Sequence, residues 1–303
     1  MQAPQDTIKV WLQAVRIHTL SAAAVPVLVG SALAGTKGRF DWTLFALTLV
    51  GSVLVQIGAN LTDEYADHEA TASAEKFLAP HKVIKRGLLS VGAVRAGAMV
   101  AFALATAIGA WLVWLTGWPL LVVCLVSLLV AWAYSAGPLP LGDYALGEVL
   151  VFIVMGPVMV AATAYVQTGL FHPEALWLSL PVAALVTAIL VINNLRDEVE
   201  DHAHGRQTLT TVFGARRARG LYFALVVLAY LVPLISVALQ FRSWWLLVPW
   251  FTLPQAVMLL RTVWRSDAPP VMHFALRGTA ALHLLFGAGL AIGLLGDFAL
   301  GGA

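Results

Sequence analysis

The stretch ALWLSLPVAALVTAILVINNLRDEVED, residues 175–201, joins a long apolar run to an acidic ending. The part from Ala175 to Leu195 contains no Asp, Glu, Lys or Arg. Its length matches the roughly 20 residues that a helix needs to cross a bilayer. The apolar run from Trp42 to Thr62 likewise leads into an acidic segment. Both stretches therefore predict membrane helices that end in a cluster of carboxylates.

The two acidic segments are near copies of each other, and we call them the acidic octapeptides. The first reads NLTDEYAD from Asn60 to Asp67, and the second reads NLRDEVED from Asn194 to Asp201. Six positions match when the histidine that follows each octapeptide is included. One such cluster at a helix end would be an ordinary interfacial feature. Two copies with the same spacing near lipid are costly without a partner, so they favour neutralisation by a bound cation.

The composition excludes a soluble globular protein. Hydrophobic residues make up 60% of the 303 residues and charged residues 11%, with a mean hydropathy of +0.85. Soluble domains carry about 25% charged residues. The net charge of +2 is too small to indicate a nucleic-acid partner, and no obligate protein partner is evident. The single cysteine, Cys124, excludes a disulfide framework and a cysteine-based metal site.

Uncharged runs along the chain predict nine membrane helices. The runs are Ile17–Thr36, Trp42–Thr62, Ala96–Gly142, Val149–Pro173, Ala175–Leu195, Leu221–Phe241, Ser243–Leu260 and Gly278–Gly296. The third run is long enough for two helices, with a turn expected at Thr116–Pro119. Continuous apolarity differs from the alternation of membrane barrel strands. The expected fold is therefore all-α, a single integral-membrane domain over residues 1–303 formed by a polytopic bundle of about nine transmembrane helices.

The basic residues predict how the bundle is oriented. Lys37, Arg39 and Arg242 fall on one side of the membrane, and the other fifteen of the eighteen Lys and Arg residues fall on the opposite side. Basic loops face the cytoplasm. We therefore expect a multi-pass protein of the cytoplasmic (inner) membrane whose amino terminus and acidic octapeptides are cytoplasmic.

Helical periodicity places the polar groups of each octapeptide on one stripe, since successive residues are rotated by about 100°. The stripes contain Asn60, Asp63, Glu64 and Asp67 in the first octapeptide, and Asn194, Asp197, Glu198 and Asp201 in the second. Like charges at this spacing repel, and a hard divalent cation would reverse that effect. Mg²⁺ is typically held by one or two carboxylates together with substrate phosphate oxygens. Two facing stripes therefore predict Mg²⁺ sites that clamp a diphosphate.

Basic residues beside the octapeptides suit a diphosphate, which needs charged hydrogen-bond donors as well as metal ions. They are Lys82, Lys85 and Arg86 after the first octapeptide, Arg196 within the second, and Arg206 after it. A diphosphate with a long hydrocarbon tail would explain the membrane setting, with its head in a cytoplasmic cavity and its tail between helices.

These motifs resemble those of the UbiA-type superfamily of intramembrane prenyltransferases. The segment Trp11–Leu20 is similar to the first helix of that family. Residues Asn193–Asp197 with Asp201, followed by Gly205–Leu209, resemble the 1,4-dihydroxy-2-naphthoate polyprenyltransferase branch. Further segments similar to that branch are Tyr134–Gly142, Gly147–Glu148 and Tyr165–Thr168. The first octapeptide departs from the branch, because Asp63-Glu64 stands where Asn-Asp is usual.

The resemblance implies a nine-helix bundle that uses Mg²⁺ to transfer an isoprenyl chain from a polyprenyl diphosphate to an aromatic acceptor. It implies that Asp63, Asp67, Asp197 and Asp201, aided by Asn60 and Asn194, hold Mg²⁺, with Glu64 and Glu198 as further candidates. Lys82, Arg86, Arg196 and Arg206 are the expected diphosphate-binding residues. Arg16 and Tyr134 are the candidates for contact with the acceptor. In this branch the acceptor is 1,4-dihydroxy-2-naphthoate and the product is a demethylmenaquinone-type quinol of menaquinone biosynthesis.

Two alternatives remain at this point. The acceptor could be 4-hydroxybenzoate, another phenol or a lipid head group, because the motifs describe the donor better than the acceptor. A protein of a different class, a cation-coupled transporter, also uses intramembrane carboxylates. Transport favours acidic residues near the middle of spans, whereas these lie at helix ends.

Overall fold

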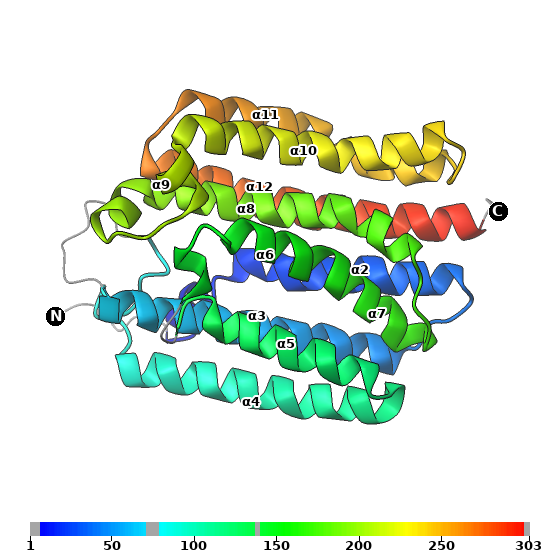
Figure 1. Ribbon diagram of the computed structural model, residues 1–303, viewed down its shortest axis with the longest axis horizontal. Coiled ribbons are helices and arrows are strands. Elements are labelled where there is room, and N and C mark those ends of the chain that lie inside the picture. Colours follow the sequence, from blue (N-terminus) through cyan, green and yellow to red (C-terminus); the bar gives the residue numbers. More distant parts are fainter. Residues whose placement is uncertain (1–6, 71–78, 137–139, 300–303) are drawn as a thin grey trace.

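The computed structural model describes residues 7–70, 79–136 and 140–299, and these residues form a bundle of helices (Figure 1). Within them the only β-type pairing is an isolated parallel bridge between Tyr144 and Gln207. The helical elements are α1 (Thr7–Ala14), η1 (Ile17–Leu20), α2 (Ser21–Thr36), α3 (Trp42–Ala70), α4 (Val91–Thr116), α5 (Pro119–Ala133), η2 (Leu141–Asp143), α6 (Gly147–Ile153), η3 (Val154–Val158), α7 (Met159–Thr168), α8 (Glu174–Ala203), α9 (Leu209–Phe213), α10 (Ala215–Ala238), η4 (Trp244–Thr252), α11 (Leu253–Arg265) and α12 (Pro269–Ala299).

The prediction of an all-α membrane bundle is confirmed. Within the described residues, eight helices are long and apolar enough to cross a membrane. The remaining predicted span is α5, a shorter apolar helix of 15 residues. It is separated from α4 by the turn expected at Thr116–Pro119, where Gly117 adopts a positive φ of 104° and Pro119 opens the next helix. Proline suits the first helical turn because its missing N–H has no partner there anyway.

The span from Gly147 to Thr168 is interrupted by a π-helical segment, η3, which contains Pro157. A proline inside a helix removes one backbone hydrogen bond, and a wider turn accommodates that loss. The same segment packs closely on α8, because a Cβ atom added to Gly156 would lie 2.3 Å from the Cβ of Ala183. Glycine at this position allows the two backbones to approach.

Helix α8 occupies the centre of the bundle. In its most hydrophobic window 78% of residues are buried, against 22% in α3 and α4, whose other faces remain free for lipid. One core cluster joins α8 to α10, α11 and α12, and a second joins it to α2, α7 and α12. The second acidic octapeptide therefore extends from the most firmly packed helix of the fold.

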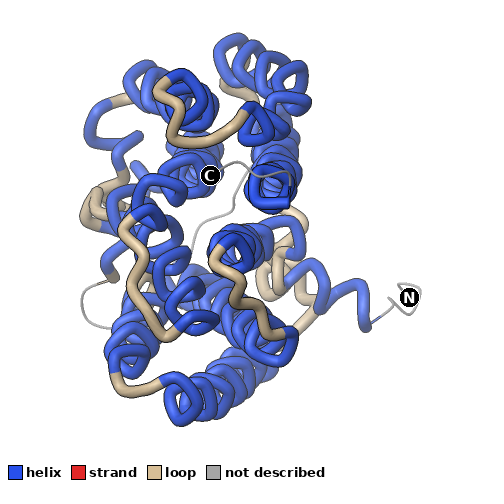
Figure 2. Tube along the Cα trace, turned by 90° about the vertical axis from the view of Figure 1, so that its right-hand side faces the viewer, coloured by secondary structure: helices blue, strands red, loops and turns tan. Residues whose placement is uncertain are grey.

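Both acidic octapeptides lie at the same end of the bundle, at the left in Figure 1. Figure 2 views the bundle nearly end-on, so that most of the helices are seen along their axes. The opposite end is secured by polar contacts, including a 2.6 Å ion pair between Lys37 and Glu174. There Asp41 also accepts hydrogen bonds from the first amides of α3, and its own amide donates to Gln167 at 2.7 Å.

We expect Gly156→Ala to destabilise the protein, because the added methyl group must displace the α8 backbone. Overpacking of this kind costs about 1–3 kcal/mol. The melting temperature in detergent, followed by size-exclusion chromatography after heating, measures the effect. Gly220→Ala is the matched control, since a Cβ at Gly220 meets no atom within 4 Å. Equal melting temperatures for the two variants would contradict the close packing of η3 on α8.

Candidate active site

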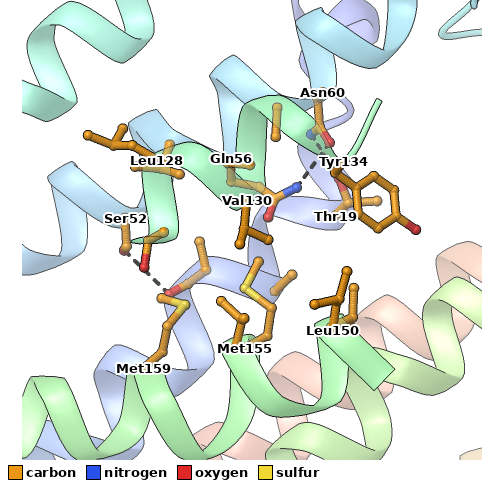
Figure 3. Close-up of a pocket in the computed structure, with 18 of the residues that line it drawn as sticks. Thr19, Ser52, Gln56, Asn60, Leu128, Val130, Tyr134, Leu150, Met155 and Met159 are labelled. Carbon is orange, nitrogen blue, oxygen red and sulfur yellow. Dashed lines mark hydrogen bonds between the residues drawn. The ribbon is translucent and has the colours of Figure 1, made fainter. Parts of the chain in front are cut away.

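A cavity of about 420 Å³ opens between the two acidic octapeptides and continues among α3, α4, α5 and the α6–α7 span. Its polar end is lined by Arg16, Asn60, Asp63, Asp67, His81, Lys82, Tyr134, Ser135, Asn193, Asn194, Arg196, Asp197, Asp201, Arg206 and Thr208. The deeper part is apolar, and Figure 3 shows Leu128, Val130, Leu150, Met155 and Met159 along it. The cavity thus joins a highly charged head region to a hydrocarbon-like interior.

The carboxylates of the first octapeptide lie one helical turn apart on α3. Asp63 forms a 2.5 Å ion pair with Arg16 and accepts a hydrogen bond from the Ser135 hydroxyl at 2.9 Å. Asp67 is paired with Lys82, and Lys85 Nζ lies 3.6 Å from the same carboxylate oxygen. Each carboxylate therefore already has a cation beside it, which offsets the cost of holding it near the membrane.

The second octapeptide presents an equivalent pair on α8. Asp197 receives two hydrogen bonds from Arg196, of 2.7 and 2.5 Å, so its partner is its own chain neighbour. Asp201 is buried, with 3% of its surface exposed, and its nearest cation is Arg206 at 3.5 Å. The spacing of four residues repeats that of Asp63 and Asp67, as helical periodicity predicts.

Arg206 connects the two octapeptides. Its guanidinium lies 3.9 Å from Asp67 on α3 and 3.5 Å from Asp201 on α8, and it donates to Asp143 at 2.7 Å. Burial alone would lower the pKa of Arg206, but the surrounding carboxylates, Asp201 foremost, raise it. The side chain therefore stays charged at the point where the two carboxylate columns converge.

Lys82 is the second buried cation of the site. Its side chain is 9% exposed, and besides Asp67 it lies 3.8 Å from Glu200. Burial works to lower the pKa of Lys82, but the Asp67 and Asp197 carboxylates outweigh burial and raise it. Opposite charges held this close in a partly buried site attract strongly. Lys82 and Arg206 are thus fixed ammonium and guanidinium donors at the mouth of the cavity.

The donor set fits Mg²⁺ shared with a phosphate ligand. Within the described residues, no group of three or more His, Cys, Asp or Glu side chains could hold a metal ion alone. Each octapeptide instead offers two carboxylates and one amide oxygen along a single helix. Mg²⁺ favours such oxygen ligands, keeps several waters and commonly completes its coordination with substrate phosphates.

Both octapeptide asparagines line the cavity. Asn60 donates its amide N–H groups to the Val15 carbonyl oxygen at 2.8 Å and to the Thr19 hydroxyl at 3.0 Å. Its carbonyl oxygen accepts from Gln56 at 3.0 Å (Figure 3). Asn60 therefore ties α3 to the segment that carries Arg16, while Asn194 takes the corresponding place on α8.

Arg16 and Tyr134, the acceptor candidates, both line the cavity. Arg16 adopts a left-handed conformation with φ 53° and ψ 58°, which is uncommon for a non-glycine residue. Such strain costs about 1–3 kcal/mol and accumulates at functional sites. Burial raises the pKa of Tyr134, so its phenol is a neutral hydrogen-bond donor.

Three predicted residues are not placed in the cavity. Glu64 is buried behind α3, where it accepts a hydrogen bond from the Ile84 amide at 2.9 Å and so supports the loop that carries Lys82. Arg86 turns away and donates to Gln13 and to the Pro80 carbonyl. Glu198 is on the side of α8 that does not line the cavity. The roles of Glu64 and Glu198 as metal ligands and of Arg86 as a diphosphate ligand stay predictions that the lining of the cavity does not support.

Three residues at the site were not singled out by their chemistry in the sequence. Asp143 pairs with Arg206, Glu148 accepts from Asn194, and His81 lies buried against the cavity beside Lys82. Burial lowers the pKa of His81, so its imidazole is neutral. A sequence signal existed for Asp143 and Glu148, because both are acidic residues flanking a span end on the octapeptide side. Gly137–Leu139 of the segment Tyr134–Gly142 lie outside the described residues.

Curated relatives match this chain over most of its length. The chain is 31% identical over 283 residues to the 1,4-dihydroxy-2-naphthoate octaprenyltransferase of Bacillus subtilis (strain 168), covering 93% of this chain and 91% of the relative. It is 28% identical to the protein of the same name from Escherichia coli (strain K12), covering 92% and 94%.

Solved structures share the fold. A UbiA homolog from Archaeoglobus fulgidus bound to GPP and Mg²⁺ superposes with a TM-score of 0.67 at 15% identity, covering 93% of this chain and 100% of that one. The apo structure of a UbiA homolog from Aeropyrum pernix K1 gives 0.68 at 18% identity, covering 90% and 97%.

The model of the UbiA prenyltransferase family matches residues 23–295, which is most of the chain. This match spans both acidic octapeptides and every helix from α3 to α11. The expectation of an enzyme is thereby confirmed over that of a transporter. The chain is a multi-pass membrane protein that belongs to the UbiA prenyltransferase family and is a prenyltransferase.

Proposed function

We propose that the protein catalyses the Mg²⁺-dependent transfer of an isoprenyl chain from a polyprenyl diphosphate to 1,4-dihydroxy-2-naphthoate. The observation that carries the proposal is the convergence of two carboxylate columns, with Lys82 and Arg206 between them, on a cavity whose interior is apolar. That arrangement suits a ligand with a diphosphate head and a hydrocarbon tail.

The arrangement of charges suggests a role for each charged side chain around the diphosphate of the substrate. Asp63 and Asp67 would hold one Mg²⁺ and Asp197 and Asp201 another, and bound Mg²⁺ supplies positive charge against the diphosphate oxygens. Lys82 and Arg206 would exchange some of their carboxylate contacts for phosphate contacts, to which charged donors bind strongly. Both cations would then stabilise the negative charge that develops on the leaving oxygen.

The reaction breaks the bond between the allylic carbon and the diphosphate oxygen, whose electron pair leaves with the diphosphate. The electron-rich ring carbon that bears the carboxylate supplies the pair for the new carbon–carbon bond. The carboxylate then leaves as CO₂, and the electron pair of its bond to the ring restores the aromatic quinol. The apolar wall formed by residues such as Leu150, Met155 and Met159 excludes water, which would otherwise capture the allylic cation.

The choice of acceptor rests on the cations of the cavity and on the relatives. Arg16 lines the cavity and bears a guanidinium group that can bind a ring carboxylate through paired hydrogen bonds. Tyr134 adds a neutral phenol donor for a ring oxygen. Relatives at 28–31% identity carry the name 1,4-dihydroxy-2-naphthoate octaprenyltransferase, which supports a place in menaquinone biosynthesis.

In the proposed orientation, the octapeptide end of the bundle and the amino terminus lie on the cytoplasmic side of the cytoplasmic (inner) membrane. This orientation is supported by Lys37, Arg39 and Arg242. They follow the carboxyl-terminal ends of α2 and α10, at the end of the bundle away from the octapeptides. The remaining basic residues of the described part of the chain lie toward the octapeptide end, as expected for cytoplasmic loops.

The acceptor is tested with purified protein in detergent, Mg²⁺ and radiolabelled farnesyl diphosphate, with 1,4-dihydroxy-2-naphthoate and 4-hydroxybenzoate supplied in parallel. We expect a prenylated naphthoquinol and release of CO₂ with the first acceptor alone. Transfer to 4-hydroxybenzoate alone would overturn the acceptor while leaving the donor site intact.

Removal of the metal or of one carboxylate should abolish most activity. EDTA is expected to stop transfer, and added Mg²⁺ to restore it. Asp63→Asn and Asp197→Asn should each lower kcat/KM by about 10²-fold or more, because each loses a group that supports charge stabilisation at the leaving oxygen. Asp267→Asn, which removes an exposed carboxylate outside the cavity, is the control. Wild-type rates in either cavity variant would rule out its carboxylate as a metal ligand.

A further inference from the structure

Glu148 is a buried carboxylate that lies behind the candidate active site. It occupies the first turn of α6, with 3% of its surface exposed. Its Oε1 atom accepts a hydrogen bond of 2.8 Å from the side-chain amide of Asn194 on α8. Glu148 does not itself line the cavity, whereas Asn194 does. The bond therefore links a hidden acid to a residue of the second octapeptide.

The hydrogen bond fixes which end of the Asn194 carboxamide faces the cavity. A carboxamide has an –NH₂ end that donates and a carbonyl end that accepts. Glu148 takes the –NH₂ end, so the carbonyl oxygen Oδ1 is directed elsewhere. Among the described residues Oδ1 has no hydrogen-bond partner, and the exposure that Asn194 retains is to the cavity that it lines. An oxygen atom is the ligand that Mg²⁺ requires.

Glu148 is held in place where two loops meet. The Ala145 amide donates to the Gln207 carbonyl at 2.5 Å, and the Gln207 amide donates to the Asp143 carbonyl at 3.1 Å. The backbone amide of Leu209, at the start of α9, lies near the Glu148 carboxyl group. Glu148 thus joins the loop before α6, the loop after α8 and the octapeptide on α8 itself.

The first octapeptide has a comparable arrangement made from different groups. Asn60 also has its –NH₂ end occupied, but by the Val15 carbonyl and the Thr19 hydroxyl. Both asparagines are therefore held by their nitrogen. For Asn194 on α8 the acceptor is the Glu148 carboxylate, which lies on α6. A carboxylate forms a stronger hydrogen bond to an amide than a neutral acceptor does.

We propose that Glu148 is a positioning residue, which holds Asn194 by its amide nitrogen so that the amide oxygen is presented to the Mg²⁺ of the second octapeptide. The inference rests on the proposed Mg²⁺ and diphosphate site and adds to it a residue that acts through Asn194. Residues that orient metal ligands typically change metal affinity or activity by 10–100-fold when removed.

The test measures binding rather than turnover. Geranyl diphosphate is titrated into the detergent-solubilised protein by calorimetry at a series of Mg²⁺ concentrations, and melting temperatures are recorded in parallel. For Glu148→Ala we expect the half-saturating Mg²⁺ concentration to rise by about 10–100-fold. Glu148→Gln, whose amide oxygen can still accept from Asn194, should lie between this variant and the wild type.

A double-mutant cycle separates positioning from general stability. If Glu148 acts through Asn194, Glu148→Ala should add little to the Mg²⁺ requirement of Asn194→Ala. Asp297→Asn is the matched control, because Asp297 is a buried carboxylate that accepts from the Ser243 amide at the opposite end of the bundle. It should alter the melting temperature without altering the Mg²⁺ requirement.

Three results would count against the proposal. An unchanged Mg²⁺ requirement in both Glu148 variants, or full additivity with Asn194→Ala, would assign Glu148 a purely structural role. If Glu148→Ala fails to fold, the Glu148→Gln titration decides alone. A wild-type protein that shows no Mg²⁺-dependent binding of geranyl diphosphate would overturn the proposed function itself, and with it this inference.

Discussion

The bundle has to hold negative charge at the edge of a membrane, and this constraint shapes its whole active end. Asp63, Asp67, Asp197 and Asp201 converge on one cavity, where mutual repulsion would otherwise drive them apart. Arg16 and Arg196 compensate Asp63 and Asp197, while Lys82 and Arg206 compensate Asp67 and Asp201. Arg206 reaches both octapeptides at once. In the proposed function, Lys82 and Arg206 would bind phosphate oxygens while Mg²⁺ binds the carboxylates. One set of charges would then serve both the stability of the site and the recognition of the proposed substrate.

The two helices that carry the octapeptides differ in how deeply they are buried in the bundle. Helix α8 is packed on several sides, so the second octapeptide extends from a fixed support. Helix α3 is held mainly through local clusters with α1, α4 and the loop around Ile84, which Glu64 secures. The cavity between them continues into apolar side chains at membrane depth, which is the environment that a hydrocarbon tail prefers. A single continuous cavity could therefore bind both the diphosphate head and the hydrocarbon tail of the proposed substrate.

The helices and the spacing of the aspartates could be predicted from the sequence, because a backbone that crosses a membrane must satisfy its own hydrogen bonds. Uncharged runs must become helices, and helical periodicity then places Asp63 with Asp67 and Asp197 with Asp201. No comparable rule predicts where the side chains of the loops lie. Arg86 turns to Gln13 instead of the cavity because the loop backbone, held by Glu64, directs it there. The contact of Glu148 with Asn194 depends on α6 packing against α8, which no local pattern in either segment specifies.

Under the proposed function, each octapeptide contributes to a metal site and both sites share one diphosphate. The most direct test is a structure of the protein with geranyl thiodiphosphate and Mn²⁺, which takes the same oxygen ligands as Mg²⁺ and can be located by anomalous scattering. We expect two Mn²⁺ ions, one coordinated by Asp63 or Asp67 and one by Asp197 or Asp201, with the diphosphate bridging them. Metal ions bound elsewhere, or a diphosphate lying outside the cavity between α3 and α8, would contradict it.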